Sequence, residues 1–365
     1  MLAAIVLLIV AAGYFFSQSQ SKNALSTAEN TKNTLKIAVL LPLTGPGANG
    51  AQYSKEGFEM AIEDIKASCG NVTIKYEDTQ TNPKTAISIF QHLQLGSTKP
   101  QVIIPELSSV TKALKPLLKN DFLTVATGVS VPNIADPASQ LYRVFLSAEG
   151  VGNTGAEYAI HAGHKSVAIV YVNDEYGQSS MAAFKNKFEE NGGVVFTETF
   201  SILEKDFRTQ WQKILHNSPM SLFITGYGPG YLTVLKQLRD TNFDGLIMTD
   251  WSLTSPEYLN ATGGVRDGTI VVAVSHDAAF EKRYQDKYKK QGFMINVGYS
   301  YDTLLCIWEA YKQSDGSVQN MAKAFGVIKN LPGFMGNLSI TSSGDVTVNY
   351  RLMKVDSGQL VPLDE

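Results

Sequence analysis

The chain has 365 residues, of which 44% are hydrophobic and 18% charged, so its composition is that of a folded globular protein and not of a disordered one. A formal net charge of −3 excludes the basic surface field that attracts nucleic acid, and we expect no nucleic-acid partner. The two cysteines, Cys69 and Cys306, match no metal-ligand spacing. We expect two buried free thiols, and a single disulfide between them is the alternative.

The N-terminal segment indicates export. Residues 1–16 form an unbroken apolar run, MLAAIVLLIVAAGYFF, and residues 17–34 form a polar segment rich in Ser, Asn and Thr. The run has about the length of a signal-peptide core and is short of the ~20 residues that span a membrane. No Lys or Arg precedes it, and no clear A-x-A cleavage site follows it. We therefore expect either an uncleaved membrane anchor or a cleaved export signal, then a flexible tether and a domain outside the cytoplasm.

From Leu35 onward, apolar runs alternate with amphipathic helical stripes. The first run, residues 36–41, is continuous, as expected of a strand that is buried on both faces. Further strands are predicted at residues 72–76, 102–105 and 123–126. The intervening helices are predicted at residues 51–67, from Asn82-Pro83 onward, and at 108–119.

The alternation restarts after residues 143–146, which suggests a second block of similar size. Strands are predicted at residues 166–172, 194–200, 221–225, 246–249 and 270–274, and helices at 150–162, 179–191, 207–215, 231–241, 280–291 and 301–314. Residues 338–341 and 346–355 are predicted to form a β-hairpin. Two consecutive βα blocks predict an α/β protein with two lobes, each a parallel sheet covered by helices, and a cleft between them.

The candidate site lies at the carboxyl ends of the strands, where open α/β sheets bind their ligands. Ser108 and Ser109 open a helix directly after the third strand, and Gly128 and Ser130 follow the fourth. Their hydroxyl and N–H groups could together bind one carboxylate. A helix N-cap is the alternative role of the two helix-opening serines.

The second block offers two tyrosines and an acid at equivalent positions. Tyr176 and Tyr227 lie in glycine-containing loops at strand ends, where they could form an aromatic wall with phenol groups that bind the ligand. The alternative is that each ring packs on its own lobe. Asp250 ends another strand and could face a cation, or it could be a turn or N-cap residue.

Other motifs give little support for catalysis. Residues 45–50, GPGANG, fit the G-x-G-x-x-G pattern of dinucleotide sites. However, three residues separate this segment from the strand, and Pro46 lacks a backbone donor, so a plain turn that approaches another ligand is favoured. No HExxH, GxSxG or P-loop motif is present, and His161 and His164 have no further metal ligand nearby. We expect no cofactor, no metal and no enzymatic activity.

Several segments resemble the type I periplasmic binding proteins of branched-chain amino acid ABC transporters, the leucine-binding proteins. They are KIAVLLPLTGPGANGAQYSKEGFEMAIEDI, YEDTQTNPKTAISIFQHL, SVAIVYVNDEYGQSSMAAFK, EKDFRTQW, GYGPGYLTVLKQLRDTNFDG and YSYDTLLCIWEAY. The resemblance runs from about Leu35 to the C-terminal hairpin. It implies two Rossmann-like lobes, joined by three crossovers near Leu146, Ser275 and Leu331. It divides the chain into residues 35–146 with 276–331 for lobe 1, and 147–275 with 332–365 for lobe 2.

The resemblance also implies a ligand site. Ser108, Gly128 and Ser130 match the residues of lobe 1 that hold the α-carboxylate, and Tyr176 and Tyr227 match two tyrosines of lobe 2. The acid that takes the ammonium group falls on Asp250 or, one place later, on Trp251.

The chain departs from the family pattern at three positions. The family's tyrosine in the glycine-rich turn falls on Gly50, and its cysteine before the first serine falls on Leu107. Glu106 is unusual so close to a carboxylate site. These departures leave an amino acid, an amide, urea or an aromatic acid open as the ligand.

The resulting hypothesis is an extracytoplasmic solute-binding protein of an ABC importer, a monomer that closes two lobes around an amino acid or a similar small carboxylate or amide. Its partners would be a membrane permease and, through the N-terminal segment, the membrane. The alternative is an extracellular ligand-sensing receptor domain on the same scaffold. A nucleotide-dependent enzyme is a third interpretation, which export to a compartment without NAD disfavours.

Overall fold

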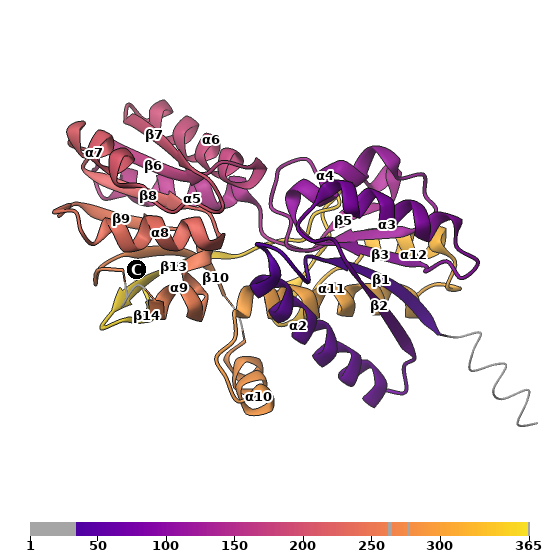
Figure 1. Ribbon diagram of the computed structural model, residues 1–365. Coiled ribbons are helices and arrows are strands. Elements are labelled where there is room, and N and C mark those ends of the chain that lie inside the picture. The colour runs from indigo at the N-terminus through magenta and orange to yellow at the C-terminus, as the bar shows by residue number, and fades with distance from the viewer. Residues whose placement is uncertain (1–33, 262–264, 276, 364–365) are drawn as a thin grey trace, which may run out of the picture.

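The computed structural model describes residues 34–261, 265–275 and 277–363, which fold into two lobes (Figure 1). The predicted apolar anchor, and all of the predicted tether except Thr34, lie outside the described residues. Across the described ranges, none of the helices combines the length and apolarity that crossing a membrane requires.

The first lobe is built on a five-stranded sheet in the order β2-β1-β3-β4-β5, with every pair of neighbours parallel. In β1 every residue except Lys36 is buried, because helices cover both faces of the sheet. This burial explains why the strands could be predicted from continuous apolar runs. The strands are β1 Leu35–Leu41, β2 Val72–Asp78, β3 Val102–Pro105, β4 Leu123–Ala126 and β5 Leu141–Arg143.

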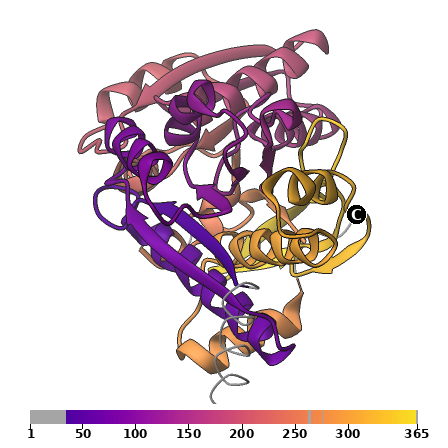
Figure 2. The same cartoon turned by 90° about the vertical axis from the view of Figure 1, so that its right-hand side faces the viewer.

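Two distant stretches of the chain supply the helices of this lobe, as Figure 2 shows from its side. Helix α2 from the N-terminal stretch packs closely along α11. The approach is so close that a Cβ atom at Gly57 would lie only 2.1 Å from the carbonyl oxygen of Val297. Helix α10 is attached to α2 by an ion pair of 2.9 Å between Arg283 and Asp64. The helices are α2 Ala48–Ala67, α3 Pro83–Leu95, α4 Ser108–Leu114, α10 Ala278–Tyr288, α11 Met294–Lys312 and α12 Val318–Gly326.

The second lobe contains a seven-stranded sheet in the order β14-β13-β10-β9-β8-β6-β7. Only β13 and β14 run antiparallel to their neighbours. The strands are β6 Ser166–Val172, β7 Val194–Phe200, β8 Ser221–Thr225, β9 Leu246–Thr249, β10 Ile270–Val274, β13 Tyr350–Asp356 and β14 Gln359–Pro362. The helices are α5 Ala148–His161, α6 Glu175–Glu190, α7 Arg208–His216, α8 Gly228–Leu238 and α9 Pro256–Ala261, with a short 3-10 turn η3 at Trp251–Thr254.

Helix α6 begins four residues earlier than the predicted Ser179. The side chain of Asp174 accepts a hydrogen bond of 2.9 Å from the backbone N–H of Gly177, and so caps the helix. Tyr176 therefore lies in the first helical turn and not in a loop, where the sequence had placed it.

The predicted C-terminal hairpin is wrong. Residues 338–341 and 346–355 share only one antiparallel bridge, between Ile340 and Val346. The hairpins are instead β11 Leu331–Gly333 with β12 Gly336–Leu338, and β13 with β14. The first one belongs with α11, because the carboxylate of Asp302 accepts hydrogen bonds from the backbone N–H groups of Phe334 (2.7 Å) and Met335 (2.9 Å). We propose on this basis that the third crossover lies after Asp345 and not near Leu331.

Both cysteines are free thiols. Cys306 is buried, as expected, but Cys69 is exposed. The expected burial of Cys69 is wrong because α2 ends at Ala67, and Cys69 follows the helix in a left-handed conformation with φ 61°.

Candidate ligand-binding site

A cavity of about 90 Å³ lies between the two lobes, at the carboxyl ends of both sheets. This volume is several times what one water molecule requires. The glycine-rich turn after β1 forms part of the wall through Gly47 and Gly50. The turn therefore brings its backbone close to the cavity. This agrees with the sequence-based preference for a plain turn that approaches a ligand over a dinucleotide site.

The loops after β3 and β4 place three of the predicted residues side by side. Ser108, Gly128 and Ser130 all line the cavity, whereas Ser109, also predicted, is not among its lining residues. The backbone N–H of Ser130 donates a hydrogen bond of 3.3 Å to the Ser108 hydroxyl, which leaves that hydroxyl's own proton available to a ligand. Gly128 has a left-handed conformation, φ 61°, and a Cβ atom there would lie 2.7 Å from Cγ of Glu106.

The second lobe covers the cavity with aromatic side chains. Tyr176 and Tyr227 both line it, and their ring centroids are 6.2 Å apart. Trp251 adds an indole that lies 6.0 Å from Tyr176 and stacks at 5.7 Å on Phe293, the residue before α11. The Tyr227 hydroxyl donates to the carboxylate of Asp174 at 2.6 Å. Both predicted tyrosines therefore reach the cavity, but this hydroxyl already has a protein partner.

Asp250 is fully buried and does not line the cavity. Its Oδ2 accepts hydrogen bonds from the Tyr176 hydroxyl, the Thr225 hydroxyl (2.8 Å) and the Gly226 N–H (2.8 Å), and its Oδ1 accepts one from the Ser252 N–H (3.1 Å). Burial raises the pKa of Asp250 to about 6, against the opposing effect of these bonds. Of the two positions that the sequence left open, Trp251 meets the cavity and Asp250 supports it from behind.

Glu106 is the only side chain with an ionisable acid or base group, tyrosines aside, among the described residues that line the cavity. It is 2% exposed, and burial raises its pKa to about 7. The sequence marked Glu106 only as unusual, because its position at the end of β3 gives no sign of which neighbours surround it. Asn296 was missed entirely, since α11 begins seven residues earlier than the predicted helix at Tyr301.

A family model described as periplasmic binding protein matches residues 34–359, which is most of the chain. The chain belongs to the periplasmic binding protein family. The resemblance found in the sequence is thereby confirmed.

Individual relatives of this periplasmic binding protein are distant. The Leu/Ile/Val-binding protein homolog 3 of Brucella melitensis biotype 1 is 24% identical over 348 residues, which cover 90% of this chain and 94% of the relative. A leucine binding protein from Thermotoga maritima has a TM-score of 0.80 at 23% identity, covering 90% of this chain and 98% of that one. A solute binding protein from R. palustris, solved in complex with benzoate, has a TM-score of 0.82 at 20% identity, covering 90% and 95%. These likenesses confirm the predicted two-lobed α/β fold.

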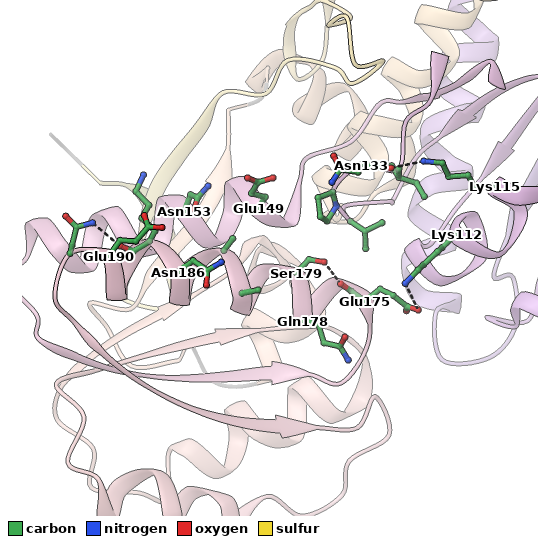
Figure 3. A pocket seen from close by; sticks show the side chains of 17 residues that line it. Lys112, Lys115, Asn133, Glu149, Asn153, Glu175, Gln178, Ser179, Asn186 and Glu190 are labelled. Carbon is green, nitrogen blue, oxygen red and sulfur yellow. Dashed lines mark hydrogen bonds and ion pairs between the residues drawn. The ribbon is translucent and has the colours of Figure 1, made fainter. Parts of the chain in front are cut away.

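The periplasmic binding protein has a second, larger groove of about 920 Å³ between α4, α5 and α6, shown in Figure 3. It is lined mainly by charged and amide side chains, and Lys112 of α4 forms an ion pair of 3.8 Å with Glu175 of α6 across it. Specific small-molecule sites are usually enclosed and largely apolar, with a few polar groups. We therefore propose the smaller, aromatic cavity as the ligand site. In the described ranges, acidic, His and Cys side chains form no cluster that could hold a metal ion.

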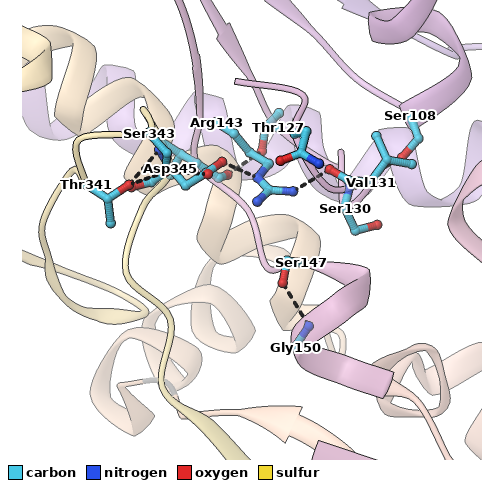
Figure 4. Close-up of polar contacts among 12 residues, drawn as sticks. Ser108, Thr127, Ser130, Val131, Arg143, Ser147, Gly150, Thr341, Ser343 and Asp345 are labelled. Carbon is cyan, nitrogen blue, oxygen red and sulfur yellow. Dashed lines mark hydrogen bonds and ion pairs between the residues drawn. The ribbon is translucent and has the colours of Figure 1, made fainter. Parts of the chain in front are cut away.

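The loop that carries Ser130 is also bonded to residues 143–148 (Figure 4). The backbone carbonyl of Ser130 accepts a hydrogen bond of 2.6 Å from the N–H of Ala148. The carbonyl of Val131 accepts one of 2.8 Å from the Arg143 guanidinium, which forms an ion pair of 2.9 Å with Asp345. In this family member, the segments around Arg143 and Asp345, which we propose to be two of the connections between the lobes, therefore meet at one side of the cavity.

Proposed function

We propose that this chain is the solute-binding component of an ABC importer, and that it binds an amino acid or a related small carboxylate or amide outside the cytoplasm. The observation that carries the proposal is the cavity between the lobes, whose wall contains residues of both. A ligand held on one lobe becomes enclosed when the other lobe swings over it, a closure known for periplasmic binding proteins. The names of the relatives, which bind leucine, isoleucine or valine, support an amino acid as the ligand.

Within this proposal, the first lobe binds the carboxylate. The Ser108 hydroxyl, the Ser130 hydroxyl and the loop around Gly128 line one side of the cavity and supply neutral donors. Tyr176, Tyr227 and the indole of Trp251 then cover the apolar part of the ligand from the second lobe. Burial of apolar surface against these rings stabilises the closed form, at about 25 cal/mol per Å².

We also propose that the protein performs no chemistry and transfers its ligand unchanged to a membrane permease. The described residues that line the cavity include no histidine or cysteine, the side chains that most often act as base or nucleophile. We propose that residues 1–16 attach the protein to the membrane or direct its export, and that the folded part works as a monomer.

A thermal-shift screen of the purified chain tests this function. The probes are the twenty common amino acids, acetamide, urea, benzoate and NADH. A ligand at 100 times its Kd adds about 2.7 kcal/mol to the free energy of unfolding, which is easily detected. We expect stabilisation by at least one amino acid. Stabilisation by NADH alone, or by none of the probes, would contradict the proposed function.

A further inference from the structure

Two acceptor atoms in the wall of the cavity have no hydrogen-bond partner in the part of the chain that the structure describes. They are Oε2 of Glu106 and Oδ1 of Asn296, both buried in residues that are 2% and 8% exposed. The orientation of the Asn296 amide is set by its Nδ2 atom, which donates at 3.2 Å to the carbonyl oxygen of Gly50. Because buried acceptors without partners are rare and costly in native proteins, these two atoms indicate that the ligand supplies N–H donors.

The two acceptors are neighbours on the first lobe. Ser54 of α2 lies between them: its hydroxyl accepts a hydrogen bond of 3.2 Å from Asn296, donates one of 3.3 Å to the carbonyl oxygen of Gly50, and is close enough to the Glu106 carboxyl to lower its pKa against the larger effect of burial. Glu106 in turn lies against Gly128 in the loop that carries Ser130. The acceptor pair and the serine donors therefore form adjacent parts of one surface.

Asp250, the other carboxylate that could bind a cation of the ligand, already has hydrogen-bond partners in the protein. Asp250 accepts four hydrogen bonds within the second lobe and does not reach the cavity. No lysine, arginine or histidine is found among the described lining residues, so Glu106 has no counter-ion among them. An ionised carboxylate in such a place requires a positive charge from the ligand.

We propose that Glu106, assisted by Asn296, binds the ammonium group of a zwitterionic ligand whose carboxylate lies on Ser108 and Ser130. This assignment rests on the proposed function as an amino-acid binding protein. The ammonium and carboxylate groups of an α-amino acid are attached to one carbon atom, so adjacent parts of one surface can bind both. The first lobe then holds both charged groups, and the ligand side chain faces the aromatic wall of the second lobe.

The same arrangement discriminates against carboxylic acids that have no amino group. A ligand carboxylate beside Glu106 meets a like charge unless Glu106 takes up a proton, whereas an ammonium group between them neutralises both. Glu106 therefore selects an amino acid over its des-amino analogue. A simple aromatic acid such as the benzoate held by the R. palustris protein would be rejected.

The protonation state of Glu106 gives the proposal a signature in pH. Burial raises its pKa to about 7 in the empty protein, and binding an ammonium group requires the ionised form. The affinity should therefore rise about twenty-fold between pH 5.5 and 7.5, as expected for a group with that pKa. The tyrosines that face it, Tyr176, Tyr227 and Tyr258, stay neutral in this range, because burial raises the pKa of each. Asp250, behind Tyr176 and with a pKa of about 6, and Asp302 of α11, with a pKa of about 7, also titrate in this range.

The test measures affinities of the full chain, in mild detergent, by titration calorimetry. The probes are L-leucine and 4-methylpentanoate, its des-amino analogue, with any other amino acid that the screen finds and its own analogue. The variant is Glu106→Gln, which keeps the shape and removes the charge. The control is Glu77→Gln, which removes a charge from β2 that pairs with Lys75 at 2.7 Å, away from the cavity.

We expect Glu106→Gln to weaken binding of the amino acid about thirty-fold or more, to leave the des-amino analogue unchanged or better bound, and to reduce the pH dependence. Glu77→Gln should change none of these. If the amino acid binds Glu106→Gln as tightly as the wild type, or if wild-type affinity falls as pH rises, Glu106 acts as a protonated donor and the ammonium assignment is wrong. If no amino acid binds the wild type, the proposed function itself fails, and the two failures are thus distinguished.

Discussion

The Tyr176 hydroxyl donates a hydrogen bond to the buried carboxylate of Asp250, and the ring that this bond holds in place lines the ligand cavity. Thr225 donates its hydroxyl proton to the same oxygen at 2.8 Å, and its oxygen lies 3.2 Å from the Ser180 hydroxyl, which can donate to it, so the contact belongs to a buried network at the end of β8. Asp250 thus meets the cavity through an aromatic side chain, and we propose that it acts on the ligand in this way and not through its own charge.

Replacing Asp250 by Asn should destabilise the protein by about 1–3 kcal/mol. The carboxylate accepts four hydrogen bonds, and the NH₂ group of the amide would face at least one of the four donor groups without being able to accept its hydrogen bond. Urea unfolding measures this loss. Ligand affinity should fall by the same factor for L-leucine and for 4-methylpentanoate, since only the tyrosine is displaced. A loss confined to leucine would mean that Asp250 contacts the ammonium group after all.

The carboxylate contacts can be tested one hydroxyl at a time. Ser108→Ala and Ser130→Ala should each weaken amino-acid binding by about 1–3 kcal/mol, as expected for hydrogen bonds to a charged group. Ser109→Ala is the matched control, since Ser109 is the neighbouring serine that does not line the cavity. Calorimetry that finds both cavity serines silent, or all three equally important, would remove the carboxylate assignment.

The stability of the empty protein should depend on pH in an unusual direction. Burial raises the pKa of Glu106 to about 7, of Asp250 to about 6 and of Asp302 to about 7. A carboxyl group whose pKa is higher in the folded state stabilises the protein while protonated, and this contribution is lost as pH rises through the folded-state pKa. The free energy of unfolding should therefore fall between pH 5 and 7.5, by up to about 3 kcal/mol for Glu106 alone.

Urea unfolding at constant ionic strength across this range checks the prediction. Glu106→Gln and Asp302→Asn should each reduce the slope, and Glu106→Gln should stabilise the empty protein at pH 7.5 while it weakens ligand binding. Carboxyl groups with lowered pKa, such as those of Glu56 and Asp78, lose their contribution only at lower pH. If the free energy of unfolding instead rises from pH 5 to 7.5, these buried acids are not the groups that determine its pH dependence.

The folded part should be independent of the N-terminal segment. A chain that begins at Thr34 should be soluble without detergent and bind the same ligand with unchanged affinity, because the polar composition of residues 17–34 contributes no hydrophobic core. Gel filtration and calorimetry of the two chains give the comparison. An insoluble shortened chain beside a well-folded full chain would contradict the proposed division.

The ion pair between Arg143 and Asp345 should contribute strongly to stability. The side chain of Arg143 is 6% exposed and that of Asp345 24%, so Asp345→Asn leaves a nearly buried guanidinium without its partner. We expect a loss of about 2 kcal/mol or more in urea unfolding. Breaking the exposed pair of Lys75 with Glu77 should cost less than about 1 kcal/mol, and equal losses would mean that burial of the Arg143 guanidinium has no effect.

The parts of the fold that sequence reasoning predicted are those set by local pattern. The strands of both parallel sheets are continuous apolar runs because both faces are covered, and their order along the chain gave the two lobes. The C-terminal hairpin was misplaced because its pairing depends on α11: Asp302 binds Phe334 and Met335, and no local pattern of residues 331–341 reveals that partner.

The candidate site was predictable only as far as strand ends could be located. Ser108, Ser130, Tyr176 and Tyr227 follow strands directly, so their common position could be expected. The role of Asp250 could not be predicted, because whether a carboxylate faces ligand or protein depends on donors from two other segments of the chain, at Tyr176 and at Thr225 with Gly226. Asn296 is the opposite case: it lines the cavity although the sequence did not indicate it, because its hydrogen-bond partner Gly50 is 246 residues away.

The hydrogen bonds from the loop after β4 to Ala148 and Arg143 involve main-chain carbonyl oxygens, those of Ser130 and Val131. A carbonyl is present whatever the side chain, so the cavity-lining side chain of Ser130 can be exchanged while these bonds stay intact. Gly128, which has a φ of 61° and lies against Glu106, has to remain glycine. Under the proposed closure of the lobes, the chain offers a scaffold for biosensors in which recognition is varied at Ser130 and the mechanical response is kept.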